Sequence, residues 1–322
     1  MKKVLLVFLL LRCSIVSSGQ NSNPIVPNTS ATIVIASGGL RLREKPSTSS
    51  RVLTTIPFGS KISYVSDQSF GEDDVSYLNN DGIATKVRGC WVKVSFNQLT
   101  GFVLDIYLFW DNNTLHRFPD TVNNEFILLY PGCGCNSGNF YDPAKWKWYG
   151  YFENEQKGLS VEPIEIRYLQ SREYTCDLIL TASKTQNLLF IIGTKHDVPN
   201  RKGLKLPAPI LISNFGNPGD SLSLKKQLAN VSLLYEQSSN EQQWHAGTLH
   251  LIKNGRKQLL NRDEYGDVYS VEYIGDIDGD GQDDYIIQYG DKGSKTILYL
   301  TSKAKEGELI HLMAAFYGGY CC

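Results

Sequence analysis

Four aspartates near the C-terminus have the type and spacing of a metal-binding loop. Residues 276–284 are Asp-Ile-Asp-Gly-Asp-Gly-Gln-Asp-Asp, and the two glycines permit a sharp bend. In such a loop alternate side chains can turn inward, and their hard carboxylate oxygens suit Ca²⁺. We therefore expect Ca²⁺ to be bound by the side chains of Asp276, Asp278, Asp280 and Asp284 and by the backbone carbonyl of Gln282.

The alternative for this segment is an acidic surface turn without a metal. Two carboxylates about 5 Å apart repel each other by roughly 3 kcal/mol at an effective dielectric of 20. Several carboxylates crowded into one turn therefore favour a cation. Since the ligands would fill the coordination shell, the expected role of the ion is structural rather than catalytic.

The loop resembles known calcium loops. Its spacing is similar to that of an EF-hand, but the twelfth position is Ile287 instead of a bidentate Glu, and the flanking segments are strand-like. It more closely resembles the calcium loops between strands of integrin-type FG-GAP repeats. The motif occurs once, so a complete propeller is not expected.

Short strands surround this loop. Apolar and β-branched residues predict strands at 269–274, 285–289 and 295–301. Further upstream, Asn254-Gly255 separates two alternating segments, which predicts a β-hairpin. The middle of the chain, 109–240, contains strand-like segments without a recognisable fold. We expect a mostly β protein.

The N-terminal part alternates short strands with turns every eight to twelve residues. Residues 39–43 (Gly-Leu-Arg-Leu-Arg), 56–59 (Ile-Pro-Phe-Gly), 91–94 (Trp-Val-Lys-Val) and 101–103 (Gly-Phe-Val) occur in this order. This series resembles the bacterial SH3-like (SH3b) domain over about 31–108. The resemblance implies a small SH3-like barrel, followed here by a β-rich C-terminal region. An acidic insertion at 66–89 is expected to form a long hairpin or loop.

The SH3b resemblance implies a ligand such as cell-wall peptide or another protein. Tyr64, Trp91 and Tyr107 are candidates for the binding face, although each could instead belong to the barrel core. A second aromatic group lies at 140–152, where Trp146 and Trp148 would share one face of a strand. Such a face could stack on sugar rings of a glycan, or it could be core.

No established catalytic motif is present, so no catalytic residue is assigned. SH3b domains often accompany peptidases similar to the NlpC/P60 family, but the nearest segment, Cys133 to Gly138, lacks the family's Asp. A glycoside hydrolase needs a pair of carboxylates. The candidates near the aromatic group are Asp142, Glu153 and Glu155. A secreted hydrolase acting on peptidoglycan or polysaccharide through 109–322 remains the alternative, as does a purely structural protein.

The first 19 residues have the pattern of a signal peptide. Lys2 and Lys3 precede the apolar run 4–11, and Ser17-Ser18-Gly19 provides small residues for cleavage. The run is too short to span a membrane, and no transmembrane segment is expected. A lipoprotein would use Cys13, but Arg12 occupies a position where that motif has a small residue. We expect a secreted or periplasmic protein, or one at the cell surface.

Seven cysteines occur, and cleavage of the signal peptide would leave six. An even number in an exported chain favours disulfide bonds. One arrangement joins the 133/135 pair to the 321/322 pair and leaves Cys90 with Cys176, but six cysteines allow 15 connectivities. The spacings do not fit a zinc site.

Charge excludes one class of partner. Removing three of the 32 basic residues with the signal peptide leaves 29 against 33 acidic residues, a net charge of −4. No basic excess is available for a nucleic acid. The expected organisation is a signal peptide (1–19), a linker (20–30), an SH3b-like domain (31–108), a β-rich region (109–240) and a C-terminal β-rich part (241–322). The last two could form one domain. The expected function is that of an exported binding protein with a structural calcium site.

Overall fold

The protein is built almost entirely of β-strands. The computed structural model describes residues 32–110, 125–134, 141–153, 158–173, 176–199, 201–205, 210–212, 221–223, 231–237, 247–263, 269–289 and 295–317. Within these ranges the chain forms 24 strands and two short 3-10 helices. The mostly β class predicted from the sequence is confirmed. The predicted signal peptide and linker lie outside the described residues.

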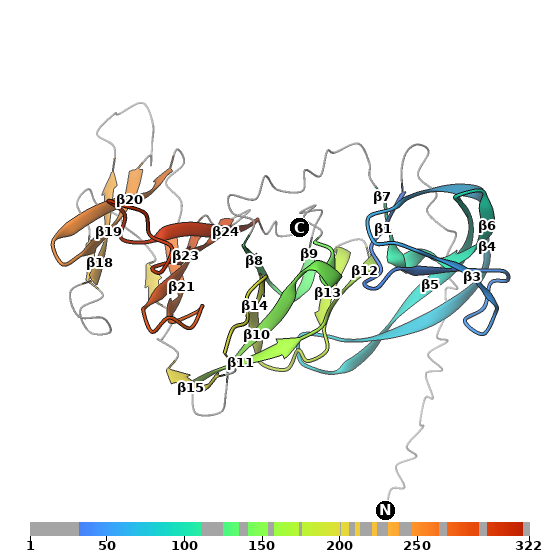
Figure 1. Cartoon of the computed structure of the whole chain (residues 1–322), viewed down its shortest axis with the longest axis horizontal. Helices are drawn as coiled ribbons and strands as arrows, with labels where there is room; N and C mark the ends of the chain where they lie inside the picture. Colours follow the sequence, from blue (N-terminus) through green and yellow to red (C-terminus); the bar gives the residue numbers. More distant parts are fainter. Residues whose placement is uncertain are drawn as a thin grey trace, which may run out of the picture.

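The N-terminal strands form a curled sheet around one hydrophobic core (Figure 1). The strand order is β3-β2-β6-β5-β4-β1-β7. Leu40 and Leu42 face the core and are almost fully buried. The intervening Arg41 therefore points outward, as expected of a strand with one solvent-exposed face. The elements are β1 (Thr32–Val34), β2 (Leu40–Arg43), β3 (Val52–Ile56), β4 (Lys61–Leu78), β5 (Ala84–Phe96), β6 (Leu99–Leu104), η1 (Asp105–Tyr107) and β7 (Leu108–Trp110).

The acidic insertion at 66–89 forms a long β-hairpin, as expected. Strands β4 and β5 pair in antiparallel register as far as Leu78 and Ala84. The tip of the hairpin reaches the central part of the protein. There Thr181 Oγ1 donates a hydrogen bond of 2.6 Å to the carbonyl of Leu78, and Thr185 Oγ1 donates another to the carbonyl of Asn79. The insertion thus ties the N-terminal sheet to the central sheets.

Two sheets make up the central part. Their orders are β15-β11-β10-β14-β8 and β12-β13-β9. Buried aromatic and β-branched side chains cover both faces of the larger sheet, which explains why these residues form strands. The elements are β8 (Phe126–Leu129), β9 (Gly132–Gly134), η2 (Pro143–Lys145), β10 (Lys147–Glu153), β11 (Gly158–Ile164), β12 (Ile166–Glu173), β13 (Cys176–Ala182), β14 (Leu188–Thr194) and β15 (Arg201–Lys205).

Two more sheets form the C-terminal part, with orders β16-β21-β22-β23-β24 and β17-β18-β19-β20 (Figure 1). The predicted hairpin at Asn254-Gly255 is confirmed: both residues have positive φ, and Lys253 pairs with Arg256. The strands are β16 (Ile210–Ile212), β17 (Ser221–Ser223), β18 (Val231–Gln237), β19 (Gly247–Lys253), β20 (Arg256–Asp263), β21 (Tyr269–Gly275), β22 (Asp284–Tyr289), β23 (Lys295–Leu300) and β24 (His311–Tyr317).

Continuous apolar packing links the three parts. One core cluster contains Tyr151 and Ile192 of the central sheet together with Ile286 and Met313 of the C-terminal sheet. A second cluster joins Trp91 and its neighbours to the central β12 and β13. The division of the chain after residue 108 into one domain or two stays a prediction.

Candidate functional site

The aspartate loop connects β21 to β22 and brings three carboxylates together. Oxygens of Asp276, Asp278 and Asp284 lie within 4.8 Å of one another. The first two side chains are half-buried, and Asp284 is fully buried. The strands fix both ends of the loop, and the positive φ of Gly279 and Gly281 allows the reversal between them. The described residues therefore contain a cluster of oxygen donors that could hold a metal ion.

Asp284 anchors the loop from inside the protein. Its Oδ2 accepts a hydrogen bond of 2.8 Å from the backbone N–H of Ile277, and its Oδ1 accepts one of the same length from Thr301. Burial raises the pKa of Asp284 to about 7, while these hydrogen bonds oppose the rise. A bound cation would stabilise the ionised form that burial disfavours.

One of the expected carboxylate ligands, Asp280, lies outside this cluster. Asp280 is exposed, and its two oxygens accept hydrogen bonds from the backbone N–H and the side-chain amide of Gln282, at 2.7 and 2.8 Å. Asp276, which belongs to the cluster, also accepts hydrogen bonds from the N–H groups of Gly279 and Gly281, at 2.6 and 3.1 Å. These short-range contacts are the turn-forming bonds that Asp favours, and they hold the loop in shape.

The donor chemistry fits a hard cation, the class to which Ca²⁺ belongs. The three clustered groups offer only carboxylate oxygens, with no nitrogen or sulfur ligand. Hard oxygen donors in a flexible loop match Ca²⁺, whereas zinc prefers cysteine and histidine. Ser302 Oγ also donates a hydrogen bond to Asp278 Oδ2, so the turn after β23 braces the same cluster.

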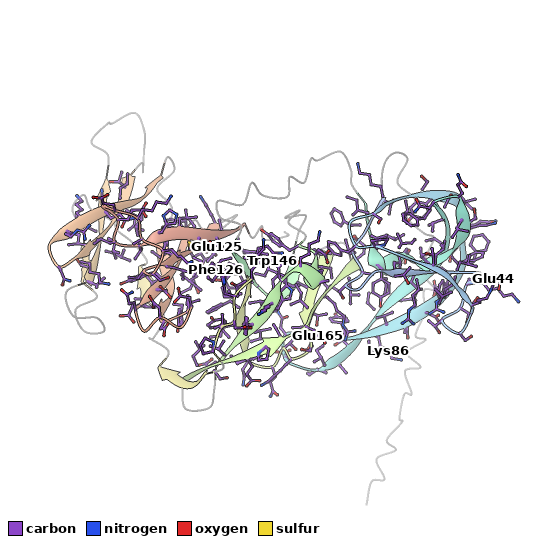
Figure 2. All side chains as sticks on the ribbon, viewed as in Figure 1. Glu44, Lys86, Glu125, Phe126, Trp146 and Glu165 are labelled. Atoms are coloured by element: carbon purple, nitrogen blue, oxygen red, sulfur yellow. The ribbon has the colours of Figure 1, made fainter. Side chains whose placement is uncertain are left out.

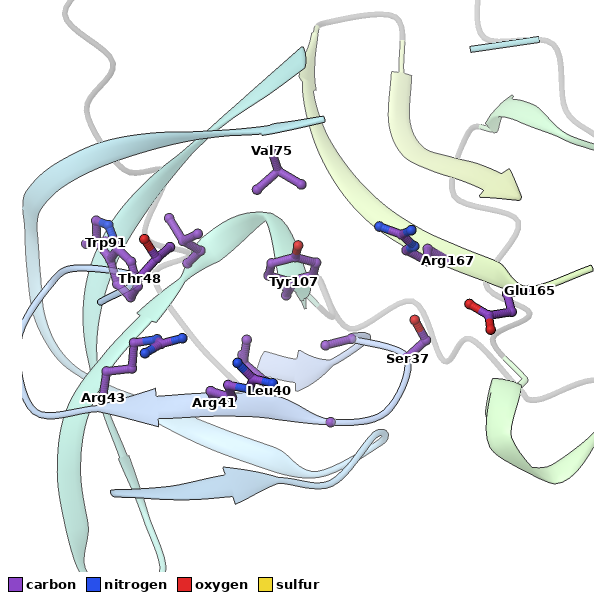
Figure 3. A pocket seen from close by; sticks show the side chains of 13 residues that line it. Ser37, Leu40, Arg41, Arg43, Thr48, Val75, Trp91, Tyr107, Glu165 and Arg167 are labelled. Carbon is purple, nitrogen blue, oxygen red and sulfur yellow. The ribbon is translucent and has the colours of Figure 1, made fainter. Parts of the chain in front are cut away.

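The N-terminal sheet and the central sheets enclose a cleft of about 460 Å³ (Figure 3). Arg41 and Arg43 line one side and Arg167 of β12 lines the other, with Tyr107 between them (Figure 3). Trp91 also lines the cleft, although the residue is only 3% exposed. Two of the three aromatic residues predicted for a binding face, Trp91 and Tyr107, thus reach this cleft.

Hydrogen bonding and burial hold the three predicted aromatic residues in place. Trp91 Nε1 donates a hydrogen bond of 3.0 Å to Asp73 on the inserted hairpin. Tyr107 is half-buried, and burial raises the pKa of its phenol while the positive charge of Arg167 opposes that rise. Tyr64 is half-buried against the barrel core and does not line the cleft.

A comparison of the sequence with known families identifies the N-terminal part of the chain. Residues 38–108 match the bacterial SH3 domain. The match starts seven residues after the expected boundary at 31 and ends at the expected residue 108. No curated protein and no solved structure matches the chain. The chain therefore has a bacterial SH3 domain at its N-terminal end and further β-sheets after it.

A second cleft, of about 520 Å³, lies beside the first and contains the two predicted tryptophans. Trp148 is 5% exposed and donates from Nε1 to the carbonyl of Pro143 at 3.0 Å. Trp146, labelled in Figure 2, is half-buried. Lys195 Nζ lies 5.1 Å from the centre of its ring. Of the two indoles, Trp146 therefore offers the larger surface to a ligand.

Two of the candidate acidic residues of a hydrolase, Asp142 and Glu153, lie in the described part of the chain. Asp142 accepts a hydrogen bond of 3.1 Å from Ala144 and caps η2, and Glu153 ends β10. Glu155 and the side chain of Cys133 lie outside the described residues.

The cysteine pairing stays a prediction. Cys90 is buried, with its Sγ 4.0 Å from Glu72 Oε1, whereas the side chains of the other six cysteines lie outside the described residues. Among the residues that the structure describes, no helix has the length and hydropathy of a membrane span.

Proposed function

We propose that this protein is an exported binding protein whose bacterial SH3 domain engages cell-wall peptide. The observation that carries the proposal is the match of residues 38–108 to the bacterial SH3 domain. The cleft beside that domain, lined by charged and aromatic side chains, supports binding as the activity. The segment 1–19, with its charged start and apolar run, supports export and a place in the periplasm, outside the cell or at its surface.

We also propose a structural role for Ca²⁺ in the aspartate loop. Asp276, Asp278 and Asp284 would hold the ion, and Asp280 and the Gln282 carbonyl would complete the shell. The ion would supply positive charge that offsets the repulsion among these carboxylates. The loop would then fix the junction between β21 and β22.

Sedimentation with purified cell walls tests the binding function. The mature chain should pellet with intact cell walls and remain in solution without them. Glycan strands freed of their peptides should fail to pellet it, because the proposed ligand is the peptide. A chain that stays in solution with intact walls would contradict the proposal.

The same incubation separates binding from hydrolysis. Release of soluble wall fragments by the chain would favour the alternative function, a hydrolase acting on peptidoglycan. Pelleting only with glycan strands would instead direct attention to the aromatic cleft around Trp146. Pelleting only when wall-attached proteins are present would identify a surface protein as the partner.

A further inference from the structure

The cleft beside the bacterial SH3 domain is held in shape by elements from both of its walls. Arg41 and Arg43 project from β2 because the intervening leucine faces the barrel core. Arg167 projects from β12, where the neighbouring Ile166 and Tyr168 are buried. The inserted hairpin contributes Val75 to the cleft and bonds to the central sheets at its tip. The opposing walls therefore have a fixed spacing.

The charges that line this cleft are unbalanced. Three guanidinium groups face one carboxylate, that of Glu165. Among the described residues, neither Arg41 nor Arg167 has an acidic partner within 4.0 Å, whereas Arg51 and Arg88 of the same domain pair with carboxylates. The cleft thus has an excess of positive charge in a protein whose overall charge is negative.

The other residues that line the cleft suit a ligand that is larger than a simple anion and has apolar parts and N–H groups. Trp91 and Leu104 are almost fully buried and provide an apolar floor, and Tyr107 adds a half-buried ring. Glu165 offers acceptors for N–H groups at the end of the cleft next to Ser37 (Figure 3). Inorganic phosphate would use the guanidiniums alone, whereas a peptide would also use the apolar floor and the carboxylate.

We propose that this cleft binds a short acidic peptide, with peptide carboxylates on Arg41 and Arg167 and peptide N–H groups directed toward Glu165. Arginine suits this role because its planar guanidinium binds a carboxylate through two parallel hydrogen bonds. The inference deepens the proposed function, on which its assignment to cell-wall peptide rests. It adds that the site is shared between the bacterial SH3 domain and β12.

Calorimetry on the full mature chain tests the inference with acetylated triglutamate amide as the probe, and with triglutamine amide and inorganic phosphate for comparison. Arg41→Gln and Arg167→Gln should each weaken binding of triglutamate about tenfold. The matched control is Arg51→Gln, an exposed arginine outside the cleft, which should leave the affinity within about twofold. Circular dichroism of each variant verifies that it folds.

Binding of triglutamate that depends on both arginines and exceeds that of triglutamine and phosphate supports the inference. Equal binding of phosphate, or binding that neither arginine variant changes, overturns it. If triglutamate fails to bind while the chain still pellets with cell walls, the inference is wrong and the proposed function stands. If arginine-dependent binding occurs but the chain does not pellet, the cleft is upheld and the cell-wall function is wrong.

Discussion

The hydroxyl of Tyr151 donates a hydrogen bond of 2.6 Å to the backbone carbonyl of Ile277, and both residues are fully buried. Tyr151 lies in the middle of the central sheet, and Ile277 lies inside the aspartate loop. The loop is therefore anchored both by the strands of its own sheet and by the neighbouring sheet. Any ion that orders the loop would also stabilise the junction between the two sheets.

Calcium should raise the stability of the mature chain. At a free concentration 100 times the dissociation constant, a ligand that binds only the folded state stabilises it by about 2.7 kcal/mol. Thermal melts in calcium and in chelator measure this effect. Asp278→Ala should abolish it, and Asp280→Ala should weaken it less because Asp280 lies outside the three-carboxylate cluster.

Asp283→Ala is the matched control for the calcium experiment. Asp283 lies in the same loop but not in the cluster, so its variant should retain the calcium response. A chain whose melting temperature is the same in calcium and in chelator would refute a structural calcium site.

Removing the Tyr151 hydroxyl should destabilise the protein. Tyr151→Phe would leave the buried carbonyl of Ile277 without this donor, at a cost of about 1–3 kcal/mol. Urea unfolding measures the change. Tyr149→Phe is the control, because its hydroxyl contacts the exposed Asp197 at 3.5 Å and its loss should cost little. Equal stability of both variants would show that the buried bond does not hold the loop.

Without calcium, the free energy of unfolding should vary with pH because Asp284 titrates. The folded state raises the pKa of this carboxyl from 3.8 to about 7, so the folded protein binds its proton more tightly than the unfolded chain does. The contribution of Asp284 to stability is complete below pH 4 and is lost as the pH rises toward 7.

Urea titrations in chelator between pH 4 and 7 test this dependence. Asp284→Asn should remove the contribution of Asp284 to the slope of unfolding free energy against pH. The variant should also be less stable overall, because both carboxylate oxygens accept hydrogen bonds from backbone N–H groups. Calcium should suppress the decline in the wild type, since the ion favours the ionised carboxylate. An unchanged slope in the variant would mean that another group titrates.

The hairpin tip should control the shape of the cleft. Replacing Thr181 and Thr185 with Val would remove both hydrogen bonds to the tip while keeping the side-chain volume similar. We expect faster hydrogen exchange in the hairpin and weaker binding of triglutamate, by about tenfold, with global stability less affected. Unaltered exchange at the hairpin would show that these contacts do not fix it.

Local patterns in the sequence predicted the elements near both sites. The Asn254-Gly255 turn, the hairpin at 66–89 and the strands around the aspartate loop depend on residues close together in the chain, and all are present. In β2, the alternation of leucine and arginine over 40–43 puts Arg41 and Arg43 on the same face.

The cleft itself could not be read from the sequence. It depends on Arg167 lying opposite Arg41, which only the packing of β12 beside the SH3 domain brings about. A single arginine in an alternating strand carries no local signal of this kind. Likewise, alternation placed Trp146 and Trp148 together, but it could not tell that Trp148 would be buried.

Hydrogen–deuterium exchange of the full mature chain, with and without soluble peptide fragments of the cell wall, tests the central claim most directly. The claim is that the bacterial SH3 domain and its cleft carry the binding. We predict slower exchange in residues 38–108 and in β12, with little change in the C-terminal sheets. No change anywhere, or slower exchange confined to 269–317, would contradict the claim.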